Sequence, residues 1–388
     1  QDLDGLMSAS KPLAVAFLGL DRFKMINDSL GHTAGDAVLE AVAARLTSVL
    51  PASTTVGSFG GDVFVILIRG AASADARTLL WRVVQRLSEP LFIAGHELRL
   101  SSSAGIAGRD AAATAESLLR DAGLAMHRAK AAGGGQVELF EVAMREEAVT
   151  RLELEASLRG AIARSELSLA LQPVVRLDDA TPVGAEALVR WHRETDTVEP
   201  ARFVAIAEES GLIITLGEWI LDHAARAVRH APGGHVVVNL SARQLASPGL
   251  PDRIARVLAA HRLPPSSLGF EITETLVVER FDYVVSVLHA IRNLGCQVGL
   301  DDFGTGYSSL GYLRRLPIDF LKIDGSLTAD VDSDCQARAI AGAIITMADA
   351  LGLEVVAEGV ETEAQATELR GLGCQLAQGY FFGRPTEI

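Results

Sequence analysis

Short apolar runs that end in a polar or acidic residue recur along the carboxyl-terminal part of the chain. Each run is typical of a buried strand. The eight runs span residues 167–175, 183–191, 235–240, 268–273, 298–301, 318–323, 353–360 and 376–382. Most of the intervals between them carry apolar residues at helical spacing, as at Leu212, Leu216 and Ile220.

Alternating strands and helices in this number predict an α/β fold. Eight strand-plus-helix units over about 220 residues match the usual size of a TIM-type (β/α)8 barrel. In such a barrel the chemistry lies at the carboxyl ends of the strands. We therefore expect the polar residues that end the eight runs to converge on one rim.

The fifth run ends in two adjacent carboxylates, Asp301 and Asp302, and continues into a loop rich in glycine, serine and threonine. Side chains alternate across a strand, so neighbouring acids face one cavity only where the strand stops being regular. Gly304 and Gly306 are expected to supply that freedom. Adjacent acids at a strand end indicate a metal site.

Acids outnumber bases among the residues that end or follow the runs. The acids are Glu186, Glu271, Glu274, Asp301, Asp302, Glu358 and Glu361, and the bases are Arg190 and Lys322. Like charges crowded at one rim must be protonated or neutralised by cations. Oxygen donors that include the Asn239 carbonyl, without Cys or His, favour Mg²⁺ or Mn²⁺. Two such ions would serve metal-assisted phosphodiester hydrolysis, although any single acid could instead be a surface acid at a helix N-terminus.

The sequence Glu186-Ala187-Leu188 links this pattern to a known protein family. From about Leu152 to the end, the chain resembles the EAL family of cyclic di-GMP phosphodiesterases. The further motifs are Val238 to Ser241, Glu271 to Glu274, Asp301 to Leu310, Leu321 to Asp324, Ala357 to Glu361 and Gln378 to Tyr380. The resemblance implies that cyclic di-GMP is hydrolysed to linear pGpG with two Mg²⁺ or Mn²⁺ ions per site.

The resemblance also implies roles for individual residues. The metal ligands it implies are Glu186, Asn239, Glu271, Asp301, Asp302 and Glu358. Lys322 resembles the group that holds or activates the attacking water, with Glu186 and Glu358 acting beside it in catalysis. The substrate contacts it implies are Gln172, Arg190, Asp302 and Gln378, with Gln172 also in the metal environment. Glu274 resembles the acid that anchors the loop from Phe303 to Ser309. Since many relatives survive only as binding modules, a non-catalytic cyclic di-GMP receptor is the alternative.

Residues 1–140 resemble the GGDEF family of diguanylate cyclases, with a buried strand pattern at 13–20 and the signature Gly60-Gly61-Asp62-Val63-Phe64. Cyclase chemistry needs acids at two strand ends to hold Mg²⁺ against the triphosphate. Gly19 and Val63 stand where the family has acids, and Gly134 stands where it has a basic residue. Pro51 to Thr54 replaces the family's inhibitory motif. We therefore predict a degenerate domain without diguanylate cyclase activity.

Asn27 and Asp36 match the family's guanine-reading pair. An amide and a carboxylate can read the edge of guanine through paired hydrogen bonds. GTP binding at these residues, acting on the neighbouring domain, is therefore a hypothesis. The alternative is that Asp36 caps a helix that begins near Ala37.

A charge-rich stretch at 141–166 with apolar positions at helical spacing predicts a helical connector between the domain at 1–140 and the domain at 167–388. It could transmit a change of state or act as a passive spacer. No apolar run reaches the roughly 18 residues that a spanning helix needs. Because the chain begins at Gln1, the sequence leaves open whether sensor or membrane segments precede it. Whether the protein forms a homodimer is also left open.

The formal net charge of −14 argues against binding to duplex nucleic acid. Cys296, Cys335 and Cys374 are widely spaced and odd in number, which indicates reduced thiols and a cytoplasmic protein.

Overall fold

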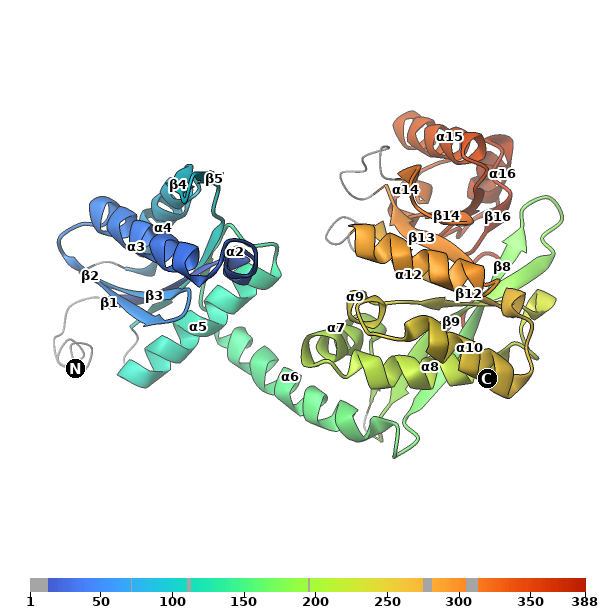
Figure 1. Cartoon of the computed structure of the whole chain (residues 1–388), viewed down its shortest axis with the longest axis horizontal. Coiled ribbons are helices and arrows are strands. Elements are labelled where there is room, and N and C mark those ends of the chain that lie inside the picture. Colours follow the sequence, from blue (N-terminus) through green and yellow to red (C-terminus); the bar gives the residue numbers. More distant parts are fainter. Residues whose placement is uncertain (1–12, 71, 110–112, 195, 275–280, 305–312) are drawn as a thin grey trace. The chain divides into compact units, whose positions relative to one another are not determined.

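The computed structural model describes residues 13–388 apart from 71, 110–112, 195, 275–280 and 305–312. The chain divides into two compact units between Leu152 and Glu153. Helix α6, Val142–Ala161, runs across this division within the predicted connector (Figure 1). Among the described residues, no helix combines the length and the apolar character that crossing a membrane requires.

The amino-terminal unit is built on a five-stranded sheet with the strand order β2-β3-β1-β6-β7. Its strands are β1 (Leu13–Leu20), β2 (Thr54–Gly60), β3 (Val63–Arg69), β6 (Ser102–Gly108) and β7 (Val137–Leu139), and a hairpin is formed by β4 (Leu91–Ile93) and β5 (His96–Leu98). Its helices are α2 (Phe23–Leu30), α3 (His32–Val49), α4 (Ser73–Leu87) and α5 (Ala115–Ala131). All eight residues of β1 are buried, as the pattern at 13–20 predicts.

Helices cover both faces of this sheet (Figure 1). Residues alternate along β1, so Ala16 and Leu18 pack in the core formed with α3 and α4. Val15 and Phe17 point the other way and pack against α5. The sheet is therefore buried on both sides, which explains why β1 is apolar throughout.

The carboxyl-terminal unit is a closed eight-stranded barrel, which confirms the predicted TIM-type fold. Around the barrel the strands are β8 (Leu167–Arg176), β9 (Pro182–His192), β11 (Val236–Asn239), β12 (Leu268–Thr273), β13 (Gln297–Phe303), β14 (Phe320–Ile323), β15 (Glu354–Ala357) and β16 (Leu376–Ala377). Two short strands, β10 (Thr197–Val198) and β17 (Thr386–Glu387), pair antiparallel with β9 and β8.

One strand departs from the eight identical units that the sequence predicts. Strand β8 runs antiparallel to both of its neighbours, β9 and β16. The five residues between Arg176 and Pro182 cannot form the crossover of a dozen or more residues that parallel strands need. A hairpin is the only connection this segment allows, and it pairs Gln172 directly with Glu186.

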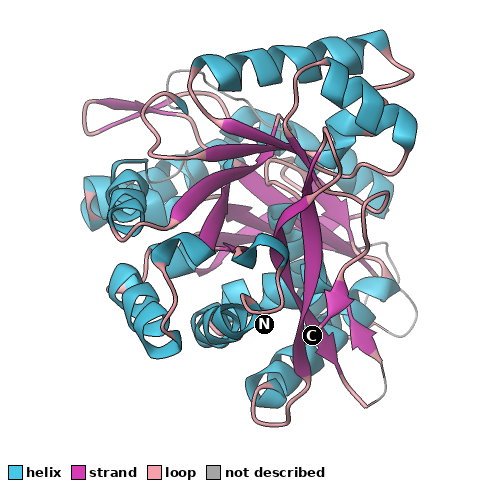
Figure 2. Ribbon diagram, turned by 90° about the vertical axis from the view of Figure 1, so that its right-hand side faces the viewer, coloured by secondary structure: helices cyan, strands magenta, loops and turns pink. Residues whose placement is uncertain are grey.

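Helices surround the strands of the barrel (Figure 2). They are α7 (Pro200–Ser210), α8 (Ile213–Ala227), α9 (Ala242–Leu245), α10 (Leu250–His261), α12 (Phe281–Asn293), α14 (Gly325–Thr328), α15 (Cys335–Ala350) and α16 (Glu363–Gly371), with two 3-10 turns, η1 (Pro232–Gly234) and η2 (Pro265–Ser267). The helical spacing seen at residues 212–220 corresponds to α8, whose buried side includes Leu216 and Leu221.

Candidate active site

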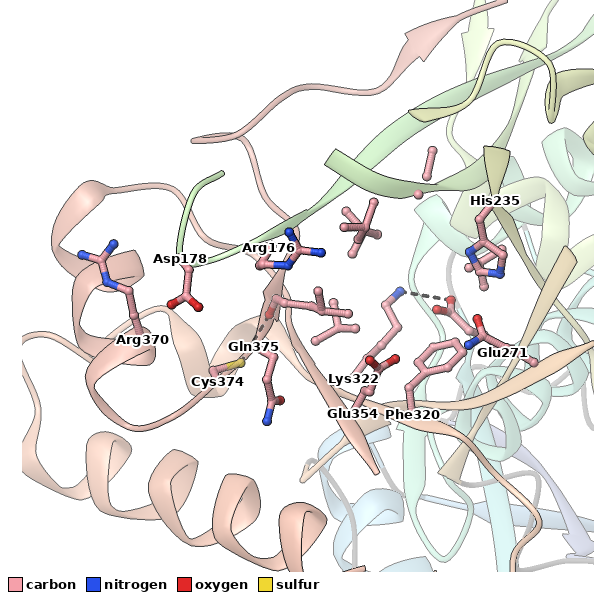
Figure 3. A pocket seen from close by; sticks show the side chains of 18 of the residues that line it. Arg176, Asp178, His235, Glu271, Phe320, Lys322, Glu354, Arg370, Cys374 and Gln375 are labelled. Atoms are coloured by element: carbon pink, nitrogen blue, oxygen red, sulfur yellow. Dashed lines mark hydrogen bonds and ion pairs between the residues drawn. The ribbon is translucent and has the colours of Figure 1, made fainter. Parts of the chain in front are cut away.

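A buried lysine lies at the centre of the predicted rim. The Lys322 side chain, on β14, is only 1% exposed. Its Nζ lies 3.0 Å from Glu186 Oε2, 3.0 Å from Glu271 Oε2, 2.6 Å from Glu358 Oε1 and 3.7 Å from Asp301 Oδ1. The bond to Glu271 is visible in Figure 3. Four predicted acids from four segments of the barrel therefore share one ammonium group.

Amides complete the surroundings of Glu186. Asn239 Nδ2 donates to Glu186 Oε1 at 2.6 Å, and Gln378 Nε2 donates to Glu186 Oε2 at 2.8 Å. Gln378 Nε2 also lies 3.1 Å from Gln172 Oε1. These bonds hold the carboxylate of Glu186 in a fixed orientation, as a metal ligand or a catalytic group requires.

The carboxylates of the two adjacent acids of β13, Asp301 and Asp302, lie close together in space. Carboxylate oxygens of Asp301, Asp302 and Glu358 lie within 4.8 Å of one another, close enough to hold one metal ion. The regular ladder between β13 and β14 breaks between Leu300 and Phe303. Asp302 itself has a φ of 56°, in the left-handed region that non-glycine residues seldom adopt. The predicted break in the strand is present, but it occurs at Asp302 as well as at Gly304, whose φ is 105°, while Gly306 lies outside the described residues.

Burial controls the protonation of these acids. It raises the pKa of Glu271 well above its usual value and that of Glu358 to about 7, and Lys322 offsets only part of the effect. Burial and neighbouring acids also raise the pKa values of Asp301 and Asp302. Such a group of acids binds protons, a lysine or divalent cations, and its all-oxygen donor set fits Mg²⁺ or Mn²⁺.

For Glu186 and Lys322, interactions with neighbouring groups outweigh the effect of burial on the pKa. Burial raises the pKa of Glu186, but Lys322 and the hydrogen bonds from Gln378 and Asn239 outweigh it, so its pKa lies below the usual value. Burial lowers the pKa of Lys322, yet the surrounding carboxylates raise it well above the usual value. Glu186 is therefore ionised and Lys322 is an ammonium ion at neutral pH.

An open cavity of about 430 Å³ lies at this rim. It is lined by Gln172, Glu186, Leu188, Gly325, Glu358, Gly359, Glu361, Gln378, Gly379 and Tyr380. Tyr380 is 51% exposed, and the Arg384 guanidinium lies over its ring at 4.3 Å. The sequence motifs alone assign Tyr380 no role. An aromatic residue directly after Gln378-Gly379 is nevertheless a signal of base binding, because aromatic side chains can stack on bases.

Two predicted residues lie apart from this cluster. Arg190 is half-buried on β9, donates to the carbonyl of Val189 at 3.0 Å and does not line the cavity. Glu274 is buried directly after β12. Most of the loop it is predicted to anchor, residues 305–312, lies outside the described residues.

The degenerate site of the amino-terminal unit holds a lysine that the sequence reasoning missed. Lys130 Nζ lies 3.3 Å from Asp62 Oδ2 and donates to the carbonyl of Leu20 at 3.1 Å. A side chain at Gly19 would begin only 2.7 Å from this Nζ. The Lys130 ammonium group therefore lies against Asp62 and occupies space that the side chain of an acid at position 19 would need.

Asn27 and Asp36 are carried by neighbouring helices, α2 and α3. A Cβ atom at Gly35 would lie 1.9 Å from Asn27 Oδ1, so Asn27 packs directly against the residue before Asp36. Helix α3 begins at His32 and not near Ala37. The alternative that Asp36 caps this helix is therefore wrong, because Asp36 lies inside it, with its side chain exposed.

Comparisons with known proteins agree with both halves of the chain. The model of the EAL domain family matches residues 155–385, and the model of the diguanylate cyclase, GGDEF domain matches residues 1–136. A Pseudomonas aeruginosa protein named bifunctional diguanylate cyclase/cyclic di-GMP phosphodiesterase MucR is 42% identical over 96% of this chain and 55% of its own length. Cyclic di-GMP phosphodiesterase NbdA, from the same organism, is 40% identical over 100% of this chain and 50% of its own length. The chain thus spans about half the length of these curated relatives.

A solved structure points the same way. The structure named PaMucR phosphodiesterase, c-di-GMP complex is 42% identical, with a TM-score of 0.57 over 60% of this chain and 97% of that chain. The chain belongs to the EAL family, and a GGDEF domain precedes its EAL domain.

Proposed function

We propose that the EAL domain hydrolyses cyclic di-GMP to linear pGpG. The observation that carries this proposal is the buried Lys322 ammonium shared by four carboxylates, next to the group formed by Asp301, Asp302 and Glu358. The complete set of acids favours catalysis over binding alone. The printed names of the relatives, a phosphodiesterase and a complex with c-di-GMP, support the substrate.

Two divalent ions fit the donor set. Asp301, Asp302 and Glu358 would hold one ion, and Glu186, Asn239 and Glu271 would contribute to the second. When bound, Mg²⁺ or Mn²⁺ ions polarise the phosphodiester and lower the pKa of water. Lys322 neutralises the same carboxylates, so its ammonium group supplies part of the positive charge that the ions would supply.

The chain's own residues orient the reaction. The three N–H groups of the Lys322 ammonium face Glu186, Glu271 and Glu358, so one of them positions the attacking water only when its carboxylate turns to a metal ion instead. Asn239 and Gln378 fix Glu186 in orientation, and Gln172 accepts a hydrogen bond from Gln378. Gln378, which lines the cavity, contacts the substrate, and Tyr380, on its rim, offers a face on which a guanine base can stack. Arg190 would contact the substrate only after turning away from the Val189 carbonyl.

The experiment that tests this function separates an enzyme from a receptor. Cyclic di-GMP is incubated with the chain and Mg²⁺ or Mn²⁺, and the products are chromatographed. We expect pGpG from the wild type and none in excess EDTA. Lys322→Ala should lower turnover far more than it weakens cyclic di-GMP binding measured by calorimetry. Tight binding of cyclic di-GMP without formation of pGpG in either metal would show that the chain is a receptor and not an enzyme.

We also propose that residues 1–140 form a regulatory domain without cyclase activity, residues 141–166 a helical connector and residues 167–388 the phosphodiesterase. Gly19 and Val63 leave Asp62 without a second acid, and Asp62 already lies against Lys130. GTP would bind at Asn27 and Asp36 and favour the active conformation. A tenfold shift in population requires GTP to prefer that conformation by about 1.4 kcal/mol.

A further inference from the structure

The short helix α14 follows the strand that carries Lys322 and contacts the loop that carries Glu358. It begins at Gly325, just after the end of β14. Gly325 and Gly359, the residue after Glu358, both line the cavity at the rim. The contacts between α14 and this loop therefore bear on where the Glu358 carboxylate lies in the candidate active site.

Two glycines allow the helix and the loop to approach closely. A Cβ atom at Gly359 would lie only 3.0 Å from the Cα atom of Gly325, which is closer than nearly all real Cβ contacts. Gly359 also has a φ of 65°, in the left-handed region that favours glycine. The backbone after Glu358 therefore lies directly against the beginning of α14, with no side chain between them.

A buried threonine forms a hydrogen bond across this contact. Thr328, the last residue of α14, is 0% exposed, and its Oγ1 donates to the backbone carbonyl of Glu358. The carbonyl of Gly325 lies 3.1 Å from the same oxygen. A hydroxyl has one proton to donate, and the Glu358 carbonyl is the nearer acceptor. Within the described part of the chain, no other group donates to this carbonyl.

The segment formed by β14 and α14 thus holds the backbone of Glu358 on both sides. The Glu358 N–H donates to the carbonyl of Ile323 at 3.1 Å, which continues the ladder between β14 and β15 by one bond. Thr328 bonds to the carbonyl of the same residue. Because Lys322 lies on β14, one stretch of chain carries the ammonium group and fixes the residue whose Oε1 lies 2.6 Å from it.

A second side chain ties the far end of this loop to α14. Gln365, 7% exposed on α16, donates through Nε2 to the carbonyl of Ala329 at 2.7 Å. Its Oε1 accepts from the backbone N–H groups of Glu361 and Thr362 at 2.8 and 3.0 Å. Since the far end of the loop is fixed in this way, the orientation of its first peptide depends on the threonine bond.

A helical threonine often bonds a carbonyl three or four residues earlier in its own helix, which would make Thr328 a packing residue alone. The bond to Glu358 distinguishes it, because this bond links α14 to a carboxylate of the candidate metal site. We infer that Thr328 is a positioning residue, whose hydroxyl holds Glu358 where its carboxylate binds the metal ion of that site. This inference rests on the proposed function, in which Glu358 is a metal ligand.

Two substitutions separate the hydrogen bond from packing. Thr328→Val keeps the shape of the side chain and removes the hydroxyl, whereas Thr328→Ser keeps the hydroxyl and removes a methyl group. The dissociation constant for Mn²⁺ is measured by calorimetry on the full chain, at one pH and without cyclic di-GMP. Loss of a group that orients a metal ligand typically weakens metal binding by about 10–100-fold. We expect Mn²⁺ to bind Thr328→Val about tenfold more weakly than the wild type, and Thr328→Ser less than about threefold more weakly.

Thr346→Val is the matched control. Thr346 donates to the carbonyl of Gly342 at 2.8 Å within its own helix, α15, and does not line the cavity. This variant should bind Mn²⁺ like the wild type. Circular dichroism and melting establish that each variant is folded, and Thr328→Ala takes the place of Thr328→Val if that variant is not.

Packing and hydrogen bonding predict opposite orders of affinity. Weaker Mn²⁺ binding by Thr328→Ser than by Thr328→Val would assign the residue to packing and overturn the inference. Equal affinity of the wild type and a folded variant without the hydroxyl, or no Mn²⁺ binding by the wild type, would overturn it too. Failure of the wild type to form pGpG would instead count against the proposed function, while the order of Mn²⁺ affinities would still decide the role of Thr328.

Discussion

Replacing Lys322 by methionine tests the electrostatics of the site without any assay of activity. The side chain is 1% exposed, and its Nζ lies 2.6–3.7 Å from four carboxylates. Removing one partner of a buried ion pair costs about 3–5 kcal/mol, because it leaves charge buried without compensation. We expect the free energy of unfolding of metal-free Lys322→Met to fall by about that amount.

Divalent cations should reverse this loss. The carboxylates of the variant have lost their only close cation among the described residues, so Mn²⁺ replaces the ammonium group. Binding to the folded state at a hundred times the dissociation constant stabilises by about 2.7 kcal/mol. Mn²⁺ should therefore stabilise Lys322→Met more than the wild type, in which the ion competes with Lys322.

The assay is urea unfolding in EDTA and in Mn²⁺, followed by tryptophan fluorescence in a Trp81→Phe background. The remaining tryptophans, Trp191 and Trp219, then report on the barrel alone. The matched control is Arg292→Met, which breaks the partly exposed pair with Asp319 at 2.7 Å and should cost about 1 kcal/mol or less. A loss below 1 kcal/mol in Lys322→Met, or an equal gain from Mn²⁺ in variant and wild type, would refute the reasoning.

The remaining predictions concern metal, pH and GTP. Asp301→Asn should abolish hydrolysis while the melting temperature in EDTA stays equal to or above that of the wild type, because the variant removes a buried charge; retained turnover would contradict its role as a ligand. The affinity for Mn²⁺, measured by calorimetry, should fall about tenfold per pH unit as the pH drops below about 7, since the pKa of Glu358 is raised to about 7 and the metal must displace its proton; a flat profile between pH 8 and 6 would contradict this. GTP should give no cyclic di-GMP under any metal condition, and it should raise pGpG formation by the wild type but not by Asp36→Ala; a flat response in both, without GTP binding, would leave the domain a structural remnant.

Much of the barrel could be predicted from the sequence because each strand is a short apolar run with a polar end. The antiparallel direction of β8 was missed, although the five residues between Arg176 and Pro182 were too few for a crossover helix. The pattern of apolar residues shows where a strand lies but not its direction. The length of the connection does show it, and here it required a hairpin.

The site was predictable where chemistry follows from residue type at a strand end. Glu186, Glu271, Asp301 and Glu358 do converge, and Lys322 lies among them. What the sequence hides is backbone geometry and long-range packing. The left-handed conformation at Asp302 depends on the break in the β13 ladder, which no local preference encodes.

Packing between distant segments explains the other differences. Lys130 reaches Asp62 because Gly19 leaves space beside it, and these three residues are far apart in the sequence. Such features require the register of every strand, which the sequence pattern alone does not provide.

The central claim, metal-dependent hydrolysis of cyclic di-GMP, is tested most directly by a single-turnover reaction in water enriched with heavy oxygen. The chain, in excess over cyclic di-GMP with Mn²⁺, should release pGpG whose terminal phosphate carries one oxygen from water, as expected when water attacks the phosphodiester. The same reaction in EDTA should leave the substrate intact. Unchanged cyclic di-GMP in Mn²⁺, or a linear product without the label, would contradict the account.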